Sequence, residues 1–226
     1  MIKIITSRAG YGKTSSLYKE ILEKDKNAEV AYLMVPEQFT LQSELALMDK
    51  VDAKGLIYAQ VMSFERLSRL VLSRVGGLKR PYIDEIGKHM ALRLIFDKHE
   101  DSLPMYKTAY KKEGFLSELS HTLSELKKMA VPPSLLLDKS NQIENNALLK
   151  QKLFEIGFIY NEFLNYMQDQ YIDNEDRISL LAEKINLYKE ISNSSFYFDS
   201  FTGFTALELS VIEQLAQMGT SLCFAL

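Results

Sequence analysis

The residues best suited to chemistry lie near the start of the chain, where a glycine-rich loop ends in a lysine and a threonine. Gly12, Lys13 and Thr14 match the end of the phosphate-binding pattern G-x-x-x-x-G-K-[ST], whereas Ser7 stands where that pattern has its first glycine. In such a loop, backbone N–H groups surround the phosphates at a helix N-terminus, whose dipole favours negative charge. The lysine reaches the β- and γ-phosphates, and the threonine hydroxyl binds Mg²⁺. The pattern therefore predicts a site for ATP and Mg²⁺. The predicted nucleotide-binding residues are Arg8, Ala9, Gly10, Tyr11, Gly12, Lys13 and Thr14.

The neighbouring sequence supports this interpretation of the loop. An apolar strand is predicted at Ile2 to Ile5, and a helix with Leu17 and Ile21 on one face is predicted at Thr14 to Lys24. The loop glycines leave the backbone free to approach a ligand closely. The alternative is an ordinary strand-to-helix turn with a solvated lysine, and the agreement of strand, glycines, Lys-Thr and helix disfavours it.

A second part of the nucleotide site is predicted at Asp199, which follows the apolar run Phe196 to Phe198. P-loop enzymes use an acid at the end of a neighbouring strand to hold Mg²⁺. The predicted metal-binding residues are therefore Thr14 and Asp199, although an aspartate can also simply end a strand. Ser200 follows where helicase-type enzymes have a glutamate, and Glu208 forms a capping-box pattern with Thr205. The sequence thus favours ATP binding over rapid turnover, and no catalytic residue is assigned.

The elements that must position these residues are strands near both ends of the chain. Continuous apolar runs are typical of parallel strands buried on both faces. Further strands are predicted at Val30 to Val35, Ile57 to Met62, Ser195 to Asp199 and Ser221 to Ala225. Helices are predicted between them at Thr40 to Lys50, from Ser63 towards Gly76, and at Ala206 to Gln217.

The middle of the chain is almost wholly helical in pattern. Helices are predicted at Asp84 to His99, Phe115 to Ala130, Leu148 to Gln168 and Arg177 to Tyr188. We therefore predict an α/β nucleotide-binding domain formed by residues 1–80 and 190–226, interrupted by a helical insertion over residues 81–189. The chain stops directly after a strand, so we expect it to be a fragment of a longer protein.

Composition limits the possible partners and compartments. The net charge is −3 over 226 residues, so the chain has no global basic field and any nucleic-acid contact must be local. Cys223 is the only cysteine, which excludes a disulfide within the chain. The sequence begins in a strand without a signal peptide and contains no apolar stretch of membrane-spanning length. We expect a cytoplasmic protein without membrane contact.

With these residues in hand, the chain resembles the N-terminal part of AddB (RexB), the B subunit of the bacterial ATP-dependent helicase/deoxyribonuclease. Four stretches carry the resemblance. They are Arg8 to Thr14 (RAGYGKT), Val35 to Thr40 (VPEQFT), Ala59 to Leu67 (AQVMSFERL) and Tyr197 to Thr205 (YFDSFTGFT) with Glu208. The likeness covers essentially the whole chain.

The resemblance implies a superfamily 1 helicase-like fold, in which a RecA-like P-loop parallel sheet is interrupted by an all-helical insertion. It also implies a subunit that pairs with an AddA-type motor subunit and processes DNA double-strand breaks for homologous recombination and repair. A nuclease domain with an iron–sulfur cluster would lie beyond residue 226. Ser200 fits the resemblance, because the helicase-like region of AddB lacks the Asp-Glu pair of true motors.

The resemblance further implies where DNA would bind. In helicases of this type, the loops after the second and third strands face single-stranded DNA. The DNA-binding candidates in those loops are Gln38, Phe39, Thr40, Ser63, Phe64 and Arg66. Amides and hydroxyls can bond phosphates, and an aromatic ring can stack on a base. The alternative is structural, with Phe64 in the core and with Ser63 and Thr40 capping their helices.

Two other functions stay open at this point. A small-molecule P-loop kinase would use the helical region as a lid, but it needs arginines clustered there, and Arg80, Arg93 and Arg177 are scattered. A scaffold whose P-loop no longer binds nucleotide is the third possibility.

Overall fold

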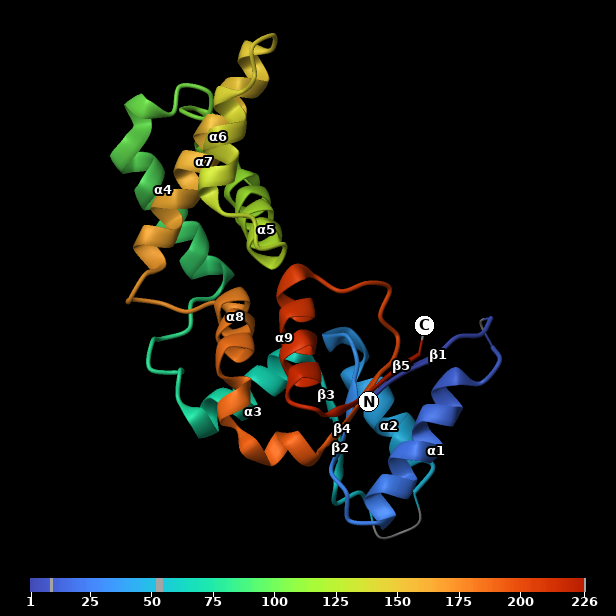
Figure 1. Cartoon of the computed structure of the whole chain (residues 1–226). Helices are drawn as coiled ribbons and strands as arrows, with labels where there is room; N and C mark the ends of the chain where they lie inside the picture. The colour runs from blue at the N-terminus through green and yellow to red at the C-terminus, as the bar shows by residue number, and fades with distance from the viewer. Residues whose placement is uncertain (9, 52–54, 226) are drawn as a thin grey trace. The chain divides into compact units, whose positions relative to one another are not determined.

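The computed structural model describes residues 1–8, 10–51 and 55–225, so the predicted nucleotide-binding residue Ala9 lies outside the described residues. The chain divides into two compact units (Figure 1). The sheet unit comprises Met1–Leu78 and Arg177–Leu226, and the helical unit comprises Lys79–Asp176.

The sheet unit is built on five parallel strands in the order β1-β5-β4-β2-β3. The strands are β1 (Ile2–Ile5), β2 (Ala31–Met34), β3 (Ala59–Met62), β4 (Ser195–Phe198) and β5 (Ser221–Ala225). Every residue of β2 and β4 is buried, as their continuous apolar runs predict for strands covered on both faces. All five predicted strands are confirmed, and the arrangement is α/β of the RecA-like kind.

Helices cover both faces of this sheet. On one face, α1 (Lys13–Lys26) and α2 (Thr40–Met48) pack against side chains such as Leu33 and Tyr197. On the other face, α3 (Phe64–Val75) and α9 (Ala206–Gln217) pack against Phe196 and Phe198. The two hydrophobic clusters alternate along each strand, because successive side chains point to opposite faces.

The structure also associates residues 177–189 with the sheet unit, whereas the sequence pattern placed them in the predicted insertion. Leu181 and Ile185 are fully buried in the same cluster as Phe196. They lie on α8 (Asn174–Lys184) and on the 3₁₀ turn η4 (Ile185–Leu187), which is followed by η5 (Lys189–Asn193). An amphipathic pattern identifies a helix and its apolar face, but it does not identify the surface on which that face packs.

The helical unit contains four α-helices among its described residues. They are α4 (Glu85–His99), α5 (Phe115–Lys128), α6 (Pro133–Asn141) and α7 (Ala147–Met167), with the short 3₁₀ turns η2 (Glu100–Ser102) and η3 (Ala109–Lys111). Their buried core includes Leu92, Phe96, Leu123, Ile159 and Phe163. In the described part of the chain, no helix is both long and apolar enough to span a membrane.

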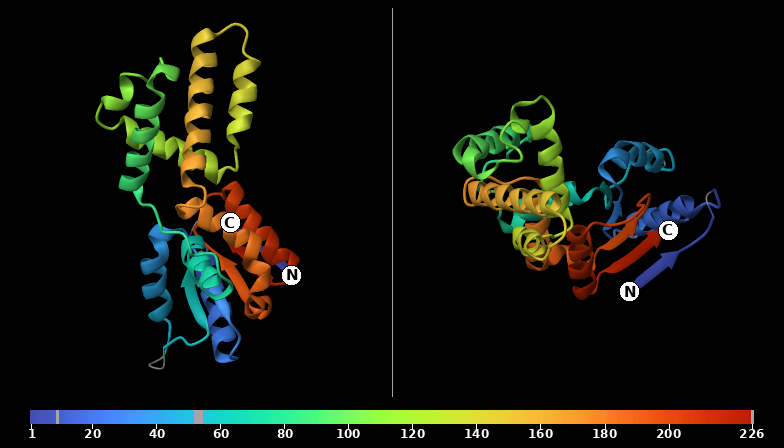
Figure 2. Two further views of the ribbon diagram at one scale, coloured as in Figure 1. Left: turned by 90° about the vertical axis from the view of Figure 1, so that its left-hand side faces the viewer. Right: turned by 90° about the horizontal axis from the view of Figure 1, so that it is seen from above.

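Helix α6 is absent from the sequence predictions, which assign Pro132-Pro133 only to the end of the preceding helix. Pro133 is the first residue of α6, where the missing N–H costs nothing and the fixed φ suits the helix. Helices α6 and α7 run side by side (Figure 2). Gly157 makes this approach possible, since a Cβ there would lie 3.0 Å from Leu137 Cδ2 and 3.2 Å from Leu136 Cβ.

A buried group of charged side chains lies within the helical unit. The Lys127 ammonium lies 2.7 and 2.8 Å from the two carboxylate oxygens of Asp173 and 2.8 Å from Asp176 Oδ1. Lys88 lies 3.6 Å from Asp173 and 3.4 Å from Glu175. Burial opposes ionisation of Asp173, but Lys127 and Lys88 outweigh it and lower the pKa of this carboxyl group. Burial and the charge of Asp173 instead raise the pKa of Glu175 and of Asp176.

Candidate nucleotide and nucleic-acid site

The loop between β1 and α1 has the backbone geometry that its two glycines predict. Gly10 and Gly12 have φ angles of +83° and +81°, in the left-handed region that other residues rarely adopt. Nothing lies within 4 Å of a Cβ built at either position, so backbone conformation and not space requires glycine. Ser7 does not share this conformation. Its departure from the pattern therefore imposes no backbone strain.

The start of α1 is open to an anion. Gly12 is its N-cap, no side chain caps the helix, and the first turn contains no acidic residue. N–H groups at such a helix start have no intrahelical acceptor, and the helix dipole favours negative charge there. Lys13 Nζ donates a hydrogen bond to the Ser7 carbonyl oxygen at 2.7 Å, so the ammonium group is held over this loop.

The remaining described loop residues face solvent. Arg8 is exposed, Tyr11 is 76% exposed, and Thr14 is exposed at the start of the helix. The Thr14 hydroxyl makes no hydrogen bond within the described residues, which leaves it available to a ligand. The loop thus combines backbone donors, one ammonium group and one hydroxyl, which are the groups needed to bind a polyphosphate.

Asp199 directly follows β4, at the same edge of the sheet as the loop that follows β1. All strands are parallel and only β5 lies between β4 and β1, so their carboxyl ends share one edge. Asp199 is 7% exposed, and its Oδ1 accepts the backbone N–H of Ser200 at 3.0 Å. Among the described residues, Asp199 and Thr14 share this edge without a hydrogen bond between their side chains.

The donor set at this edge fits Mg²⁺ shared with a phosphate. No three His, Cys, Asp or Glu side chains are grouped to hold a metal ion by themselves within the described ranges. Mg²⁺ commonly uses only one or two protein oxygens and completes its shell with phosphate and water. The Thr14 hydroxyl and the Asp199 carboxylate could supply those protein oxygens.

Tyr18 belongs to this region although the sequence motifs did not indicate it. It lies one helical turn after Thr14 in α1 and is 5% exposed. Burial raises the pKa of the Tyr18 phenol and the Asp199 carboxylate adds to the rise, while the Ser43 hydroxyl opposes it. Tyr18 therefore brings α1, α2 and the end of β4 together. Its position four residues after Thr14 was the available signal, because that spacing returns to one helix face.

The loop after Asp199 is conformationally strained at one residue. Ser200 has a φ of +64°, which a residue with a Cβ adopts at a cost of about 1–2 kcal/mol. Further along, the capping box predicted at the start of α9 is confirmed. The Thr205 N–H donates to Glu208 Oε2 at 2.8 Å, and the Glu208 N–H donates to Thr205 Oγ1 at 3.3 Å. Glu208 is thus engaged in capping a helix.

Three of the DNA-binding candidates lie between β2 and α2. Gln38 and Phe39 belong to η1 (Glu37–Phe39); Gln38 is exposed and Phe39 is 36% exposed. Thr40 is buried, and its hydroxyl donates to the Glu37 carbonyl oxygen at 2.9 Å. The first two side chains are accessible to a ligand, whereas Thr40 stabilises its own turn.

The other three candidates, between β3 and α3, are engaged within the protein. Ser63 caps α3 by accepting the Arg66 N–H at 3.2 Å, and its hydroxyl donates to the Glu37 carboxylate. Arg66 pairs with Glu44 and lies 3.9 Å from Glu37. Phe64 is only 4% exposed and packs in the core, so it is not available to stack on a base. The structural alternative for Ser63 and Phe64 is therefore the one observed.

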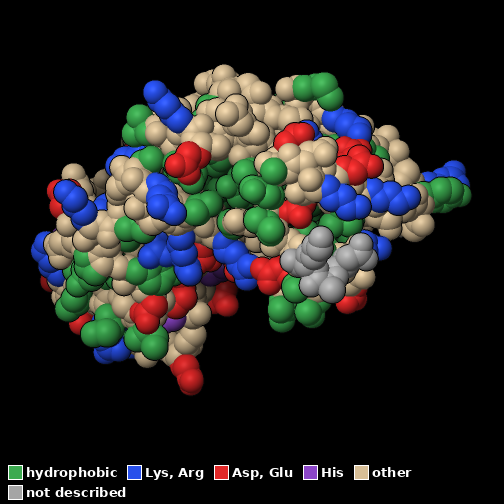
Figure 3. Space-filling view, turned by 90° about the horizontal axis from the view of Figure 1, so that it is seen from below, with side chains coloured by type: hydrophobic (Ala, Val, Ile, Leu, Met, Phe, Trp, Pro, Cys, Tyr) green, Lys and Arg blue, Asp and Glu red, His purple; other side chains and the backbone are tan. Residues whose placement is uncertain are grey.

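Acidic and basic side chains are interspersed on the face of the molecule drawn in Figure 3. In the helical unit, Lys107 and Lys111 pair with Asp101 and Glu100. Hydrogen bonds to these acids raise the pKa of both lysines. Local contacts, and not a charged face, must therefore carry any affinity for nucleic acid.

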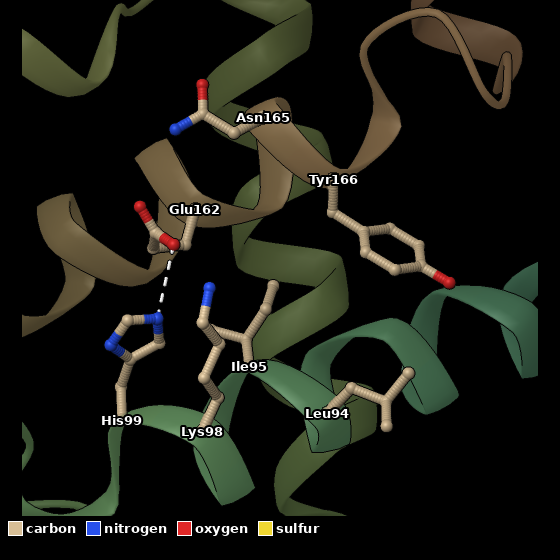
Figure 4. Close-up of a pocket in the computed structure, with 7 residues that line it drawn as sticks. All are labelled: Leu94, Ile95, Lys98, His99, Glu162, Asn165 and Tyr166. Carbon is tan, nitrogen blue, oxygen red and sulfur yellow. Dashed lines mark ion pairs between the residues drawn. The ribbon is translucent and has the colours of Figure 1, made fainter.

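A hollow of about 490 Å³ lies between α4 and α7 of the helical unit (Figure 4). His99 Nε2 lies 3.2 Å from Glu162 Oε2 at its side. Its lining residues are Leu94, Ile95, Lys98, His99, Glu162, Asn165 and Tyr166. None of them is a predicted site residue, so this hollow is separate from the candidate nucleotide site.

Comparison with known proteins identifies the family. Residues 4–226 match the family described as "ADDB, N-terminal". The B subunit of the ATP-dependent helicase/deoxyribonuclease of Alkaliphilus metalliredigens is 40% identical over 218 residues, which are 96% of this chain and 19% of the relative. Proteins of the same name from Alkaliphilus oremlandii and a Thermoanaerobacter species are 39% identical over 96% of the chain and 37% identical over 95% of it. The chain spans about a fifth of the length of these relatives, 19% in each case. The chain therefore belongs to the AddB family and corresponds to its N-terminal region.

Proposed function

We propose that this chain is the nucleotide- and DNA-binding region of a helicase/deoxyribonuclease subunit that processes DNA double-strand breaks in homologous recombination and repair. The observation that carries the proposal is the uncapped start of α1, reached through a loop with two positive-φ glycines and with Lys13 at its end. The names of the relatives supply the larger enzyme, and the P-loop geometry supplies the local role.

Each group of the loop has a definite role in this proposal. The Lys13 ammonium exchanges the Ser7 carbonyl oxygen for phosphate oxygens, and the N–H groups at the start of α1 bind the same phosphates. Thr14 and Asp199 hold Mg²⁺, which neutralises phosphate charge when bound. ATP is thus bound without rapid hydrolysis, since Ser200 replaces a glutamate and Glu208 is engaged in its capping box.

The DNA-binding part of the proposal rests on Gln38 and Phe39. Their side chains are exposed at one loop, where an amide can bond a phosphate and a ring can stack on a base. The proposed partner is an AddA-type motor subunit, and the proposed compartment is the cytoplasm. An iron–sulfur cluster is assigned only to a region beyond this chain, because Cys223 is its single cysteine and is buried.

Calorimetry with MgATP tests the nucleotide site. The unchanged chain should bind MgATP, and Lys13→Ala should weaken binding at least about tenfold, since roughly 1.4 kcal/mol corresponds to a factor of ten and charge-assisted bonds exceed it. Lys19→Ala is the matched control, because Lys19 is an exposed lysine on the same helix. Equal losses in both variants, or no binding by the unchanged chain, would contradict the nucleotide site and favour the scaffold alternative.

Two further measurements separate the other roles. Incubation with ATP and nucleoside monophosphates should give no phosphoryl transfer; transfer would support the kinase alternative instead. An oligothymidylate single strand should bind with an affinity that falls with salt. Phe39→Ala should weaken this binding roughly 5- to 150-fold, the equivalent of one stacked base. Phe154→Ala, which removes a ring that is 42% exposed in the helical unit, should leave it unchanged.

A further inference from the structure

Five phenylalanines of the sheet unit form a continuous cluster beside the loop that carries Asp199. They are Phe64, Phe198, Phe201, Phe204 and Phe224. The Phe198 and Phe224 rings stack with centroids 4.6 Å apart, and those of Phe201 and Phe204 lie 4.7 Å apart. The Phe64 centroid lies 5.9, 6.3 and 6.5 Å from those of Phe201, Phe198 and Phe204, all within the range of favourable aromatic pairs. Phe64 thus touches three rings of the Asp199 segment.

These rings fix the backbone on both sides of Asp199. Phe198 immediately precedes the aspartate, and Phe201 follows it by two residues. Between them, Ser200 adopts its left-handed φ of +64°. A strained residue persists only where its surroundings hold it. The contacts that Phe198 and Phe201 make with Phe64 are therefore part of what sets the position of the Asp199 carboxylate.

On its other side, Phe64 is tied to the loop that carries Gln38 and Phe39. Ser63 precedes it, and the Ser63 hydroxyl donates to the Glu37 carboxylate of η1. Arg66, near the start of α3, lies 3.9 Å from the same carboxylate. The connection therefore runs from η1 through Ser63 and Phe64 to the Asp199 loop, by direct contact at each step.

We infer that Phe64 is a positioning residue that links single-stranded DNA at the Gln38–Phe39 loop to Mg²⁺-nucleotide at the Asp199 edge, so that each ligand changes the affinity for the other. This inference rests on the proposed function and adds regulation of the same site. Its physical basis is close packing, since a buried ring cannot shift without moving the rings against it. Couplings between two sites in proteins are commonly about 5- to 150-fold.

The decisive experiment measures the dissociation constant for MgATP with and without saturating oligothymidylate. In the unchanged chain the two constants should differ at least about fivefold. Phe64→Leu should still bind both ligands, but their ratio should fall close to one. Phe196→Leu is the matched control, because Phe196 is fully buried in the same core and pairs with Tyr32 at 5.1 Å, away from the Asp199 rings. It should reduce stability and keep the ratio.

A spectroscopic measurement follows the loop directly. The chain contains no tryptophan, so Phe201→Trp introduces a single emission reporter next to Ser200. Oligothymidylate should shift its emission when Phe64 is present and leave it unchanged in the Phe64→Leu background. If Phe64→Leu does not fold by circular dichroism, Phe64→Met takes its place, since a methionine fills irregular core space.

The possible outcomes distinguish the inference from the proposed function. An unchanged chain that binds both ligands without mutual effect would overturn the inference and leave the proposed function standing. A full ratio in folded Phe64→Leu would also overturn it. Failure of the unchanged chain to bind either ligand would remove the proposed function and this inference together.

Discussion

Changing Asp173 to Asn should strongly destabilise the helical unit, because two buried ammonium groups would lose the carboxylate they share. Asp173 is fully buried, and Lys127 contacts both of its oxygens at 2.7 and 2.8 Å. Breaking one partner of a buried ion pair costs about 3–5 kcal/mol. Here Asp176 and Glu175 remain beside Lys127 and Lys88. We therefore expect the lower end of that range, about 3 kcal/mol.

Glu175→Gln is the matched comparison for this prediction. The pKa of Glu175 is raised by burial and by the charge of Asp173, so its ionised form costs folding free energy at neutral pH. Neutralising Glu175 should therefore change stability by less than about 1 kcal/mol, although the same cluster is altered. Hydrogen exchange of the amides in α5 and α7, with those of α1 as an internal reference, measures the free energy of opening in the unit concerned.

The pH dependence gives the prediction a sign. The pKa of Asp173 is lowered in the folded protein, so its stabilisation is present above its unfolded pKa of about 3.9 and is lost as the pH falls through the folded pKa. The difference between the unchanged chain and Asp173→Asn should therefore be constant near neutrality and shrink below about pH 4. An effect no larger than that of Glu175→Gln, or a difference that persists in acid, would refute the reasoning.

Three further changes test single features of the fold. Gly12→Ala places a Cβ at a φ of +81° and should cost about 1–2 kcal/mol of stability and weaken MgATP binding, whereas Gly203→Ala, also in open space, should do neither; calorimetry and thermal denaturation measure both effects. Gly157→Ala should destabilise the α6–α7 pair by about 1–3 kcal/mol despite the better helix propensity of alanine, because the new Cβ meets Leu137 at 3.0 Å; a raised denaturation midpoint would show that α6 can move aside. Thr205→Ala should cost about 1 kcal/mol through loss of the capping box and leave MgATP affinity unchanged, and a lower affinity would instead assign Glu208 or its loop to the nucleotide site.

Local sequence signals predicted the elements that depend on local physics. The apolar runs of β2 and β4 indicated buried parallel strands, and Gly10 and Gly12 indicated a loop with unusual dihedrals. Thr205 and Glu208 indicated a helix start in the same way. In each case the residues that carry the pattern are also the residues that make the interaction.

Features that depend on distant residues were not predictable from one sequence. The burial of Phe64 requires Phe198, Phe201 and Phe204, which are more than a hundred residues away along the chain. The charged group around Asp173 likewise unites residues from three separate helices or loops. Pro133 was misleading for a different reason, since a proline that ends one helix can also begin the next.

The contact between Lys13 and the Ser7 carbonyl oxygen makes nucleotide binding an exchange of acceptors and not a simple addition. A carbonyl offers the ammonium group only a partial negative charge, whereas a terminal phosphate offers a full one, with a stronger charge-assisted bond. A nucleoside or a monophosphate that is too short to reach the lysine must leave this internal bond in place and gains nothing from it. The resting loop would thereby select its ligands by the length of their phosphate chain, before any feature of the base or sugar is recognised.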